Sequence, residues 1–377
     1  MKPDLPASPE RDQLGHYLSQ MVTREASDLF FSSGAPASLK IQGQIQRLPE
    51  QALSAERIRG LAYSVMREPQ IRQFEAELEC DLALTLEGLG RFRVNVYRQR
   101  GDVAMVVRHI NSRIPSLELL KLPPILKTLA MLKRGLVLVV GAAGAGKSTT
   151  LAAMLDYRNE MASGHILTVE DPMEFEHRHK RSLIDQREVG LDTLSFEEAL
   201  RHAMREAPDV IMIGEIRDRG TMRHALAYAE TGHLCVSTLH ASNANQAIQR
   251  ILNFFPEAAH RQVLMDLSLN LKGIIAQRLL RGSADTLVPA AEVMLLSPYI
   301  ADLIQKGQTD EIKAVMAKST DLGMATFDQS LYDLYLRGDI TQEQAIDQAD
   351  SKTDLSLHIR LRSGHAPDAG TLRVVPG

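Results

Sequence analysis

The stretch VVGAAGAGKSTT, residues 139 to 150, decides the fold of this chain. It contains the complete P-loop pattern for binding nucleotide phosphates: Gly141, four further residues, and then Gly146, Lys147 and Ser148. An apolar run, LVLVV, precedes the pattern, and a helical stretch, STTLAAMLDYR, follows it. A P-loop requires a strand before it and a helix after it, so we predict a nucleotide site rather than a chance glycine-rich turn.

Each part of this loop has a role in binding a nucleoside triphosphate. Glycines allow the backbone to turn its N–H groups toward the β-phosphate, and the N-terminus of the following helix adds its dipole. Lys147 places a positive charge between the β- and γ-phosphates, and the Ser148 hydroxyl can bind Mg²⁺. We therefore predict ATP and Mg²⁺ as ligands. The predicted nucleotide-binding residues are Gly141, Gly144, Ala145, Gly146, Lys147, Ser148 and Thr149.

Three more short apolar runs follow the loop: ILTV at 166–169, VIMI at 210–213 and LCVST at 234–238. Strands without polar alternation are buried on both faces, so these runs predict a parallel sheet covered by helices. Each run ends in polar residues that can perform chemistry, and these are Glu170 and Asp171, Glu215, and His240. Because ligands of such sheets bind at the carboxyl ends of the strands, we expect these groups to gather at one site.

The remaining sequence divides into further segments. Residues 1–112 read as an α+β domain, with a hairpin around Gly43, a helix capped by Ser54 and two strands around Gly101. The proline-containing segment 113–124 is the predicted linker, and 125–350 is the predicted ATPase domain, mostly helical beyond Leu287. Residues 351–377 are predicted to be a flexible tail.

Composition limits the possible environments and partners. A formal net charge of −4 gives no general attraction for a polyanion, so we expect no nucleic-acid partner. The N-terminal residues do not resemble a signal peptide, and no apolar run approaches the roughly 18 residues of a membrane span. We therefore expect a cytoplasmic protein. Cys80 and Cys235 are widely separated, which favours buried thiols over a disulfide or a metal site.

Hydrolysis requires one carboxylate beside the metal and another that orients water. Glu215, directly after DVIMIG, is the candidate for the metal side. The run ILTVEDPMEFEH offers four candidates for the other role, and chemistry alone does not choose among them. These four are Glu170, Asp171, Glu174 and Glu176.

Histidines and arginines leave further alternatives open. His233 and His240 flank the last apolar run, either as sensors of the γ-phosphate or as hydrogen-bonded core histidines. Arginines alternate with apolar residues in RFRVNV and its neighbours, which is typical of a half-exposed strand, but one or two are candidates for arginine fingers. The arginines of this region are Arg91, Arg93, Arg98, Arg100 and Arg108.

Taken together, these motifs resemble the PilT/PilU family of type IV pilus retraction ATPases, within the secretion ATPase superfamily. Four boxes carry the resemblance in order, with QREVG between the second and third: GAAGAGKST, ILTVEDPMEFEH, DVIMIGEIRD and TGHLCVSTLH. The resemblance implies a hexamer of subunits with a PAS-like N-terminal domain and a RecA-like ATPase domain. It also implies roles for individual residues: Glu174 as the catalytic glutamate, Glu215 as the Walker B acid and a metal ligand, His233 and His240 as the histidine-box pair, and Arg93 and Arg108 near the nucleotide.

Within the family, the resemblance is closer to PilU, the accessory retraction ATPase. SPYIADLI stands where PilT has its AIRNLI-type motif, and the four-cysteine zinc site of extension and secretion ATPases is missing. The implied function is ATP-driven pilus retraction and twitching motility. The implied partners are a homo-hexamer or a mixed ring with a PilT-like ATPase, and the inner-membrane platform protein at the pilus base. Alternatives are a regulatory subunit without turnover, an extension or type II secretion ATPase, and a DNA-translocating hexamer.

Overall fold

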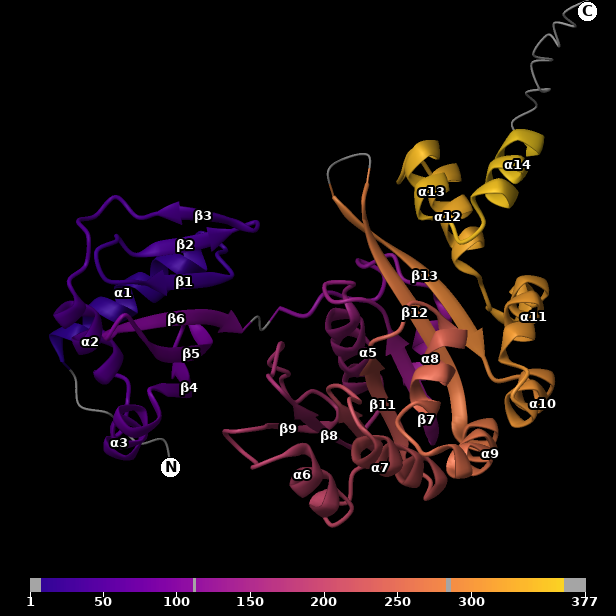
Figure 1. Cartoon of the computed structure of the whole chain (residues 1–377), viewed down its shortest axis with the longest axis horizontal. Helices are drawn as coiled ribbons and strands as arrows, with labels where there is room; N and C mark the ends of the chain where they lie inside the picture. The colour runs from indigo at the N-terminus through magenta and orange to yellow at the C-terminus, as the bar shows by residue number, and fades with distance from the viewer. Residues whose placement is uncertain (1–7, 111–112, 283–285, 363–377) are drawn as a thin grey trace, which may run out of the picture. The chain divides into compact units, whose positions relative to one another are not determined.

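The computed structural model describes residues 8–110, 113–282 and 286–362 of the 377-residue chain (Figure 1). The chain forms two compact units. The first unit comprises Met1–Ile114 together with two later segments, Asp171–Arg178 and Arg187–Ser195, and the second comprises the rest. Residues 115–124, predicted as linker, belong to the second unit, because Leu117 and Leu122 are buried in its core.

The first unit is a six-stranded sheet with helices, as the α+β pattern predicts. Its strand order is β3-β2-β1-β6-β5-β4, and the neighbouring strands are antiparallel. The strands are β1 (Asp28–Phe31), β2 (Ser38–Ile41), β3 (Gln44–Arg47), β4 (Glu79–Leu86), β5 (Gly90–Gln99) and β6 (Asp102–Ile110). The helices are α1 (Pro9–Thr23), α2 (Ala55–Tyr63) and α3 (Glu68–Glu77). Both predicted hairpins are confirmed, and the Ser54 side chain caps α2 by accepting from the backbone N–H of Arg57.

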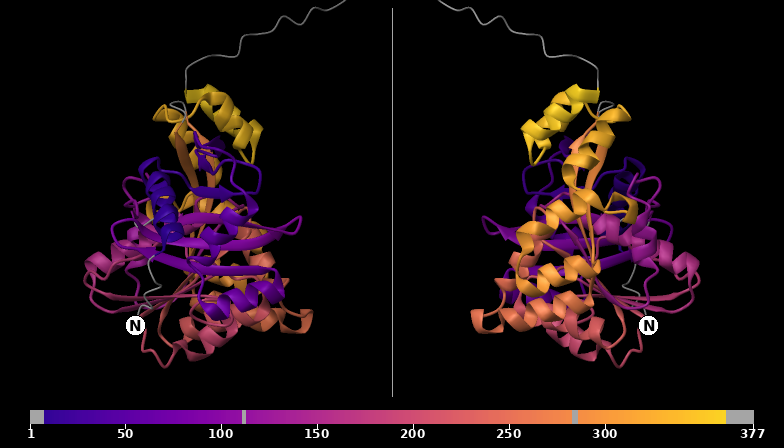
Figure 2. Two further views of the ribbon diagram at one scale, coloured as in Figure 1. Left: turned by 90° about the vertical axis from the view of Figure 1, so that its left-hand side faces the viewer. Right: turned by 90° about the vertical axis from the view of Figure 1, so that its right-hand side faces the viewer.

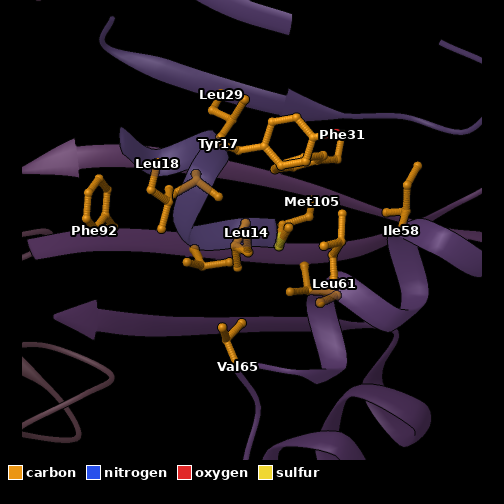
Figure 3. Packing of buried hydrophobic residues seen from close by; sticks show 14 of the residues in the cluster. Leu14, Tyr17, Leu18, Leu29, Phe31, Ile58, Leu61, Val65, Phe92 and Met105 are labelled. Carbon is orange, nitrogen blue, oxygen red and sulfur yellow. The ribbon is translucent and has the colours of Figure 1, made fainter. Parts of the chain in front are cut away.

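The core of the first unit lies between helices α1 and α2 and one face of this sheet (Figure 3). Tyr17 of α1 and Phe31 of β1 meet edge to face, with ring centroids 5.2 Å apart. Along β5 the apolar Phe92 and Val94 are fully buried, while Arg91 and Arg93, which alternate with them, are only partly buried. Alternation with a period of two therefore assigns the arginines to the opposite face of the sheet.

The second unit contains a seven-stranded sheet in the order β13-β12-β7-β11-β10-β8-β9. Its strands are β7 (Gly135–Val140), β8 (His165–Glu170), β9 (Leu183–Glu188), β10 (Val210–Ile213), β11 (Leu234–Leu239), β12 (Leu271–Arg281) and β13 (Leu287–Leu295). The four predicted apolar runs are β7, β8, β10 and β11, and their pairings are parallel, which confirms the parallel sheet. Every residue of β7, β10 and β11 is buried, which explains why these runs lack polar alternation.

Helices cover both faces of this sheet. The connection from β7 to β8 and the connection from β10 to β11 run in opposite directions across the sheet. Right-handed crossovers therefore place the two connecting helices, α5 (Lys147–Met161) and α7 (Arg219–Glu230), on opposite faces. The helices up to β12 are α4 (Ile125–Ala130), α5 (Lys147–Met161), α6 (Phe196–Ala203), α7 (Arg219–Glu230), α8 (Ala244–Leu252) and α9 (His260–Asn270), with a 3₁₀ turn η1 (Glu257–Ala259). The reversal of direction beside β7 creates the crevice in which such sheets bind ligands.

The C-terminal part differs from the expectation of mostly helix beyond Leu287. β13 is a strand that pairs antiparallel with β12, and β12 pairs parallel with β7, with a bulge at Lys272 between Leu271 and Gly273. Short apolar runs fit a buried strand as well as a buried helix, so the sequence pattern did not reveal this pair. The elements after β13 are α10 (Pro298–Lys306), η2 (Thr309–Glu311), α11 (Ile312–Lys318), η3 (Thr320–Leu322), α12 (Phe327–Leu336), α13 (Gln342–Gln348) and α14 (Lys352–Arg362).

The last helices lie beside the end of the β12–β13 pair that is farther from α10 (Figures 1 and 2). Arg278 of β12 anchors them, since it donates to the Gln348 carbonyl, pairs with Asp350 and stacks over the Phe327 ring at 3.9 Å. Residues 352–362 form α14, which buries Leu355 and Ile359, so the predicted flexible tail is wrong for this segment. Residues 363–377 of that prediction lie outside the described residues.

Candidate nucleotide site

The P-loop connects the carboxyl end of β7 to the first turn of α5, as predicted. Gly144 and Gly146 have φ values of 76° and 85°, a backbone region that side chains disfavour, so glycine is required at both turns. The Lys147 ammonium donates to the carbonyls of Gly141 at 3.0 Å and Ala142 at 2.9 Å. The lysine thus lies over the loop, where a phosphate would bind.

Two neighbouring strands hold Glu215 near this loop. The β11 side chains of Ser237 and Thr238 donate to the carbonyls of Ile213 and Gly214, each at 2.7 Å, and so fix the end of β10. Glu215 follows directly, with 18% of its side chain exposed.

The Glu215 carboxylate contacts one histidine and one arginine. His240 Nε2 lies 2.9 Å from Oε1, and Arg217 Nε lies 2.7 Å from Oε2. The structure therefore brings together the predicted metal-side acid and one histidine of the histidine box.

His233 does not join this group. It precedes β11, and its ring hydrogen-bonds to the Thr231 hydroxyl at 3.1 Å. Because β11 pairs with β7 from Leu234 opposite Gly135, His233 lies at the amino end of the sheet. Six strand residues, roughly 20 Å at about 3.3 Å per residue, separate it from His240. Within one subunit, the two histidines therefore cannot contact the same phosphate.

The four candidate acids of the second box are divided between the two units, with Glu170 in the second unit and the other three in the first. Glu170 ends β8 and is 7% exposed, and its Oε1 accepts from the Thr168 hydroxyl and the Gln186 amide. Glu174 is exposed, and it belongs to the segment that clusters with the first unit, as do Asp171 and Glu176. Glu170 is thus held by its neighbours, whereas the role of Glu174 as the catalytic glutamate stays a prediction.

Arg93 and Arg108 lie directly opposite each other on β5 and β6. Like charges in such a pair repel, and each arginine has an acidic partner that offsets this repulsion. Arg93 Nε is 3.6 Å from Asp81, and Arg108 Nε is 2.8 Å from the buried Asp28. The two candidate arginine fingers therefore share one face of the first unit, and 63% of the Arg108 side chain is exposed.

Two other arginines of this region have structural partners in the first unit. Arg91 lies 3.8 Å from the buried carboxylate of Glu188, in the QREVG sequence. Burial raises the pKa of Glu188, and Arg91 opposes this rise. Arg98 pairs with Glu75 and stacks over Phe74. These contacts match the alternative in which some of the arginines have no part in catalysis.

A groove of about 460 Å³ begins at the start of the P-loop. It is lined by Gly141, Ala142, His240, Ala241, Ser242, Gln246, Gln249, Arg250 and Asn253. The α8 members recur at helical spacing, so one polar face of α8 borders the groove. Sequence reasoning did not select these residues, although a polar i, i+3, i+4, i+7 pattern directly after the histidine box was the available signal.

The chemistry of this site fits Mg²⁺. Magnesium usually keeps several waters and takes few protein ligands besides substrate phosphates, so Ser148 and Glu215 are an adequate donor set. Among the described residues there is no group of three or more His, Cys, Asp or Glu side chains arranged to hold a metal by themselves. No helix within the described ranges combines the length and apolar character needed to cross a membrane.

Comparison with known proteins identifies the family. The family model described as type II/IV secretion system protein matches residues 8–328. The type IV pilus ATPase PilU of Pseudomonas aeruginosa is 54% identical over 349 residues, covering 92% of this chain and 91% of PilU. The chain belongs to the PilT/PilU family. PilT of the same organism, a type IV pilus retraction ATPase, is 41% identical and covers 86% of this chain and 94% of PilT.

The solved structures agree with membership of the PilT/PilU family. A crystal structure of the pilus retraction motor PilT with bound ADP has a TM-score of 0.85 and 40% identity, covering 91% of this chain and 98% of that one. The expected fold, an N-terminal α+β domain followed by a RecA-like ATPase domain, is confirmed, and so is the expected enzyme class of ATPase.

Proposed function

We propose that this chain hydrolyses ATP to drive type IV pilus retraction, as a PilU-like accessory partner of a PilT-like ATPase. The observation that carries the proposal is the contact between Glu215 and His240 at the carboxyl ends of β10 and β11, beside the P-loop. The higher identity to PilU than to PilT supports the accessory role.

The residues of the site would divide the chemistry among them. Lys147 and the loop N–H groups bind the phosphates, and Ser148 and Glu215 would hold Mg²⁺, which neutralises charge on the phosphate oxygens. His240 would respond when the γ-phosphate leaves, and its contact with Glu215 supports this role. We assign Glu174 to orient the attacking water, following the family motif.

The assembly belongs to the same proposal. A ring of six subunits, homomeric or mixed with a PilT-like ATPase, would allow Arg93 or Arg108 to approach a nucleotide bound by a neighbouring subunit. The exposed Arg108 side chain supports such a role, because a finger must be available to a neighbour. We place the ring at the cytoplasmic face of the inner membrane, where it would turn the platform protein of the pilus.

Steady-state ATP turnover of the purified chain tests hydrolysis, alone and with a PilT-like ATPase. We expect magnesium-dependent turnover that Glu174→Gln strongly reduces while nucleotide still binds, since the amide retains the shape and loses the basicity. If the chain alone binds nucleotide without turnover, and adds nothing to the turnover of the PilT-like ATPase, the regulatory subunit is favoured instead. Normal turnover by Glu174→Gln would assign the orientation of the attacking water to Asp171 or Glu176 instead.

Mixing two inactive variants tests the shared site. Arg108→Ala and Glu174→Gln subunits should recover part of the turnover together, because an intact arginine on one chain can meet an intact glutamate on another. Arginine fingers supply roughly 10³ to 10⁵ in rate, so even partial recovery is measurable. Mixed rings shown by mass to contain both chains, yet inactive, would assign Arg108 to a structural pair with Asp28.

A further inference from the structure

Strand β12 places one buried polar side chain, Gln277, directly beneath the P-loop. In the parallel pairing of β12 with β7, Ala276 lies opposite Val140, so Gln277 is the next residue, beside the start of the loop. Only 4% of this residue is exposed.

Gln277 contacts both ends of the loop. A Cβ atom at Gly141 would lie 2.6 Å from the backbone carbonyl oxygen of Gln277, and one at Gly146 would lie 3.0 Å from the side-chain Nε2 of Gln277. Both glycines are therefore needed for the loop to rest against this residue. The Thr150 hydroxyl, in the first turn of α5, donates to Gln277 Oε1 at 2.7 Å in a buried hydrogen bond.

A buried amide is costly unless it forms hydrogen bonds, and leucine of similar volume would fill the same space without that cost. The amide instead joins the strand beside the loop to the helix after it, with the loop's last glycine against its nitrogen. The phosphate-binding N–H groups lie between these two attachments.

We infer that Gln277 is a positioning residue that holds the P-loop in its phosphate-binding conformation through Thr150. This inference rests on the proposed nucleotide site. A loop held before the ligand arrives loses less conformational freedom on binding, so the contact improves nucleotide affinity without touching the nucleotide. A residue that only packed the core would affect unfolding and leave affinity unchanged.

Binding of fluorescent ADP to the full-length protein tests this, with thermal unfolding measured in parallel. Gln277→Leu keeps the volume and Thr150→Val keeps the shape, but each removes the hydrogen bond. We expect each to weaken ADP binding by about threefold to tenfold, as the loss of one hydrogen bond predicts. Together they should weaken it no more than either alone, and Thr150→Ser should retain wild-type affinity.

Ser268→Ala is the matched control, because it removes a buried hydroxyl that donates within α9, an element that does not carry the loop. It should lower the melting temperature and leave ADP affinity unchanged. If Gln277→Leu behaves in the same way, or if the effects of Gln277→Leu and Thr150→Val add, Gln277 is a packing residue and the inference fails. If Gln277→Leu does not fold, the ADP affinities of Thr150→Val and Thr150→Ser decide whether the inference holds. Failure of the wild type itself to bind ADP would instead overturn the proposed function.

Discussion

Glu292 offers a measurable link between pH and stability. It lies in β13 with only 3% of the residue exposed, and its Oε1 accepts from the backbone N–H of Ala244 at the start of α8. Burial raises the pKa of Glu292 from 4.5 to about 7, against the lowering effect of that hydrogen bond. Asp350 raises this pKa further, whereas Lys313 and Arg278 lower it.

The rise in the pKa of Glu292 determines the sign and size of the change in unfolding free energy with pH. Below pH 4.5 Glu292 is protonated in both states, and above pH 7 it is charged in both, so the folded state bears the full cost of the buried charge only above pH 7. At about 1.4 kcal/mol per pH unit, the cost approaches about 3 kcal/mol. The contribution of Glu292 to the free energy of unfolding thus falls by this amount as pH rises from 4.5 to above 7.

Glu292→Gln removes this titration while keeping an oxygen that can accept the Ala244 N–H. Urea unfolding at pH 5 and pH 8, followed by circular dichroism because the chain has no tryptophan, gives the comparison. We expect the variant to gain about 2 to 3 kcal/mol over the wild type between these pH values. Glu343→Gln, at an exposed position of α13, is the control. Parallel pH profiles for wild type and Glu292→Gln would refute the reasoning.

Further predictions concern single side chains. Lys147→Ala should abolish nucleotide binding, seen by ADP titration, with an unchanged circular dichroism spectrum, because it removes a phosphate contact and no core packing. Phe92→Ala should destabilise the first unit by about 3 to 5 kcal/mol in urea unfolding, since a fully buried ring leaves a cavity; a loss below about 1 kcal/mol would contradict this packing. Ser54→Ala should cost about 1 kcal/mol through the lost α2 cap, and Ser54→Thr should cost much less.

The sequence was most informative where a local pattern determines a local structure. The P-loop needs only its own glycines and the flanking strand and helix, and the runs that became β7, β8, β10 and β11 are buried on both faces wherever they pair. The placement of Glu215 beside His240 also followed from strand ends alone.

Features that depend on distant segments were not predictable in this way. His233 and His240 are close in sequence, but the direction of β11 carries them to opposite ends of the sheet. The helix Lys352–Arg362 has little sequence signal of its own and buries Leu355 and Ile359. Gln277 was not selected because its meaning depends on β12 pairing beside β7, a contact across more than a hundred residues.

The bulge at Lys272 decides which way every later side chain of β12 points. Successive strand residues face opposite sides of a sheet, so Gln277 is directed to the P-loop and Arg278 to α12, the end of α13 and Asp350. If Lys272 instead paired regularly with Val137, every later residue would shift by one position, so Ala276 would stand where the amide meets Thr150 and Gln277 would stand where Arg278 anchors the last helices. One extra backbone residue therefore sets the orientation of two neighbouring side chains that serve opposite faces of the sheet.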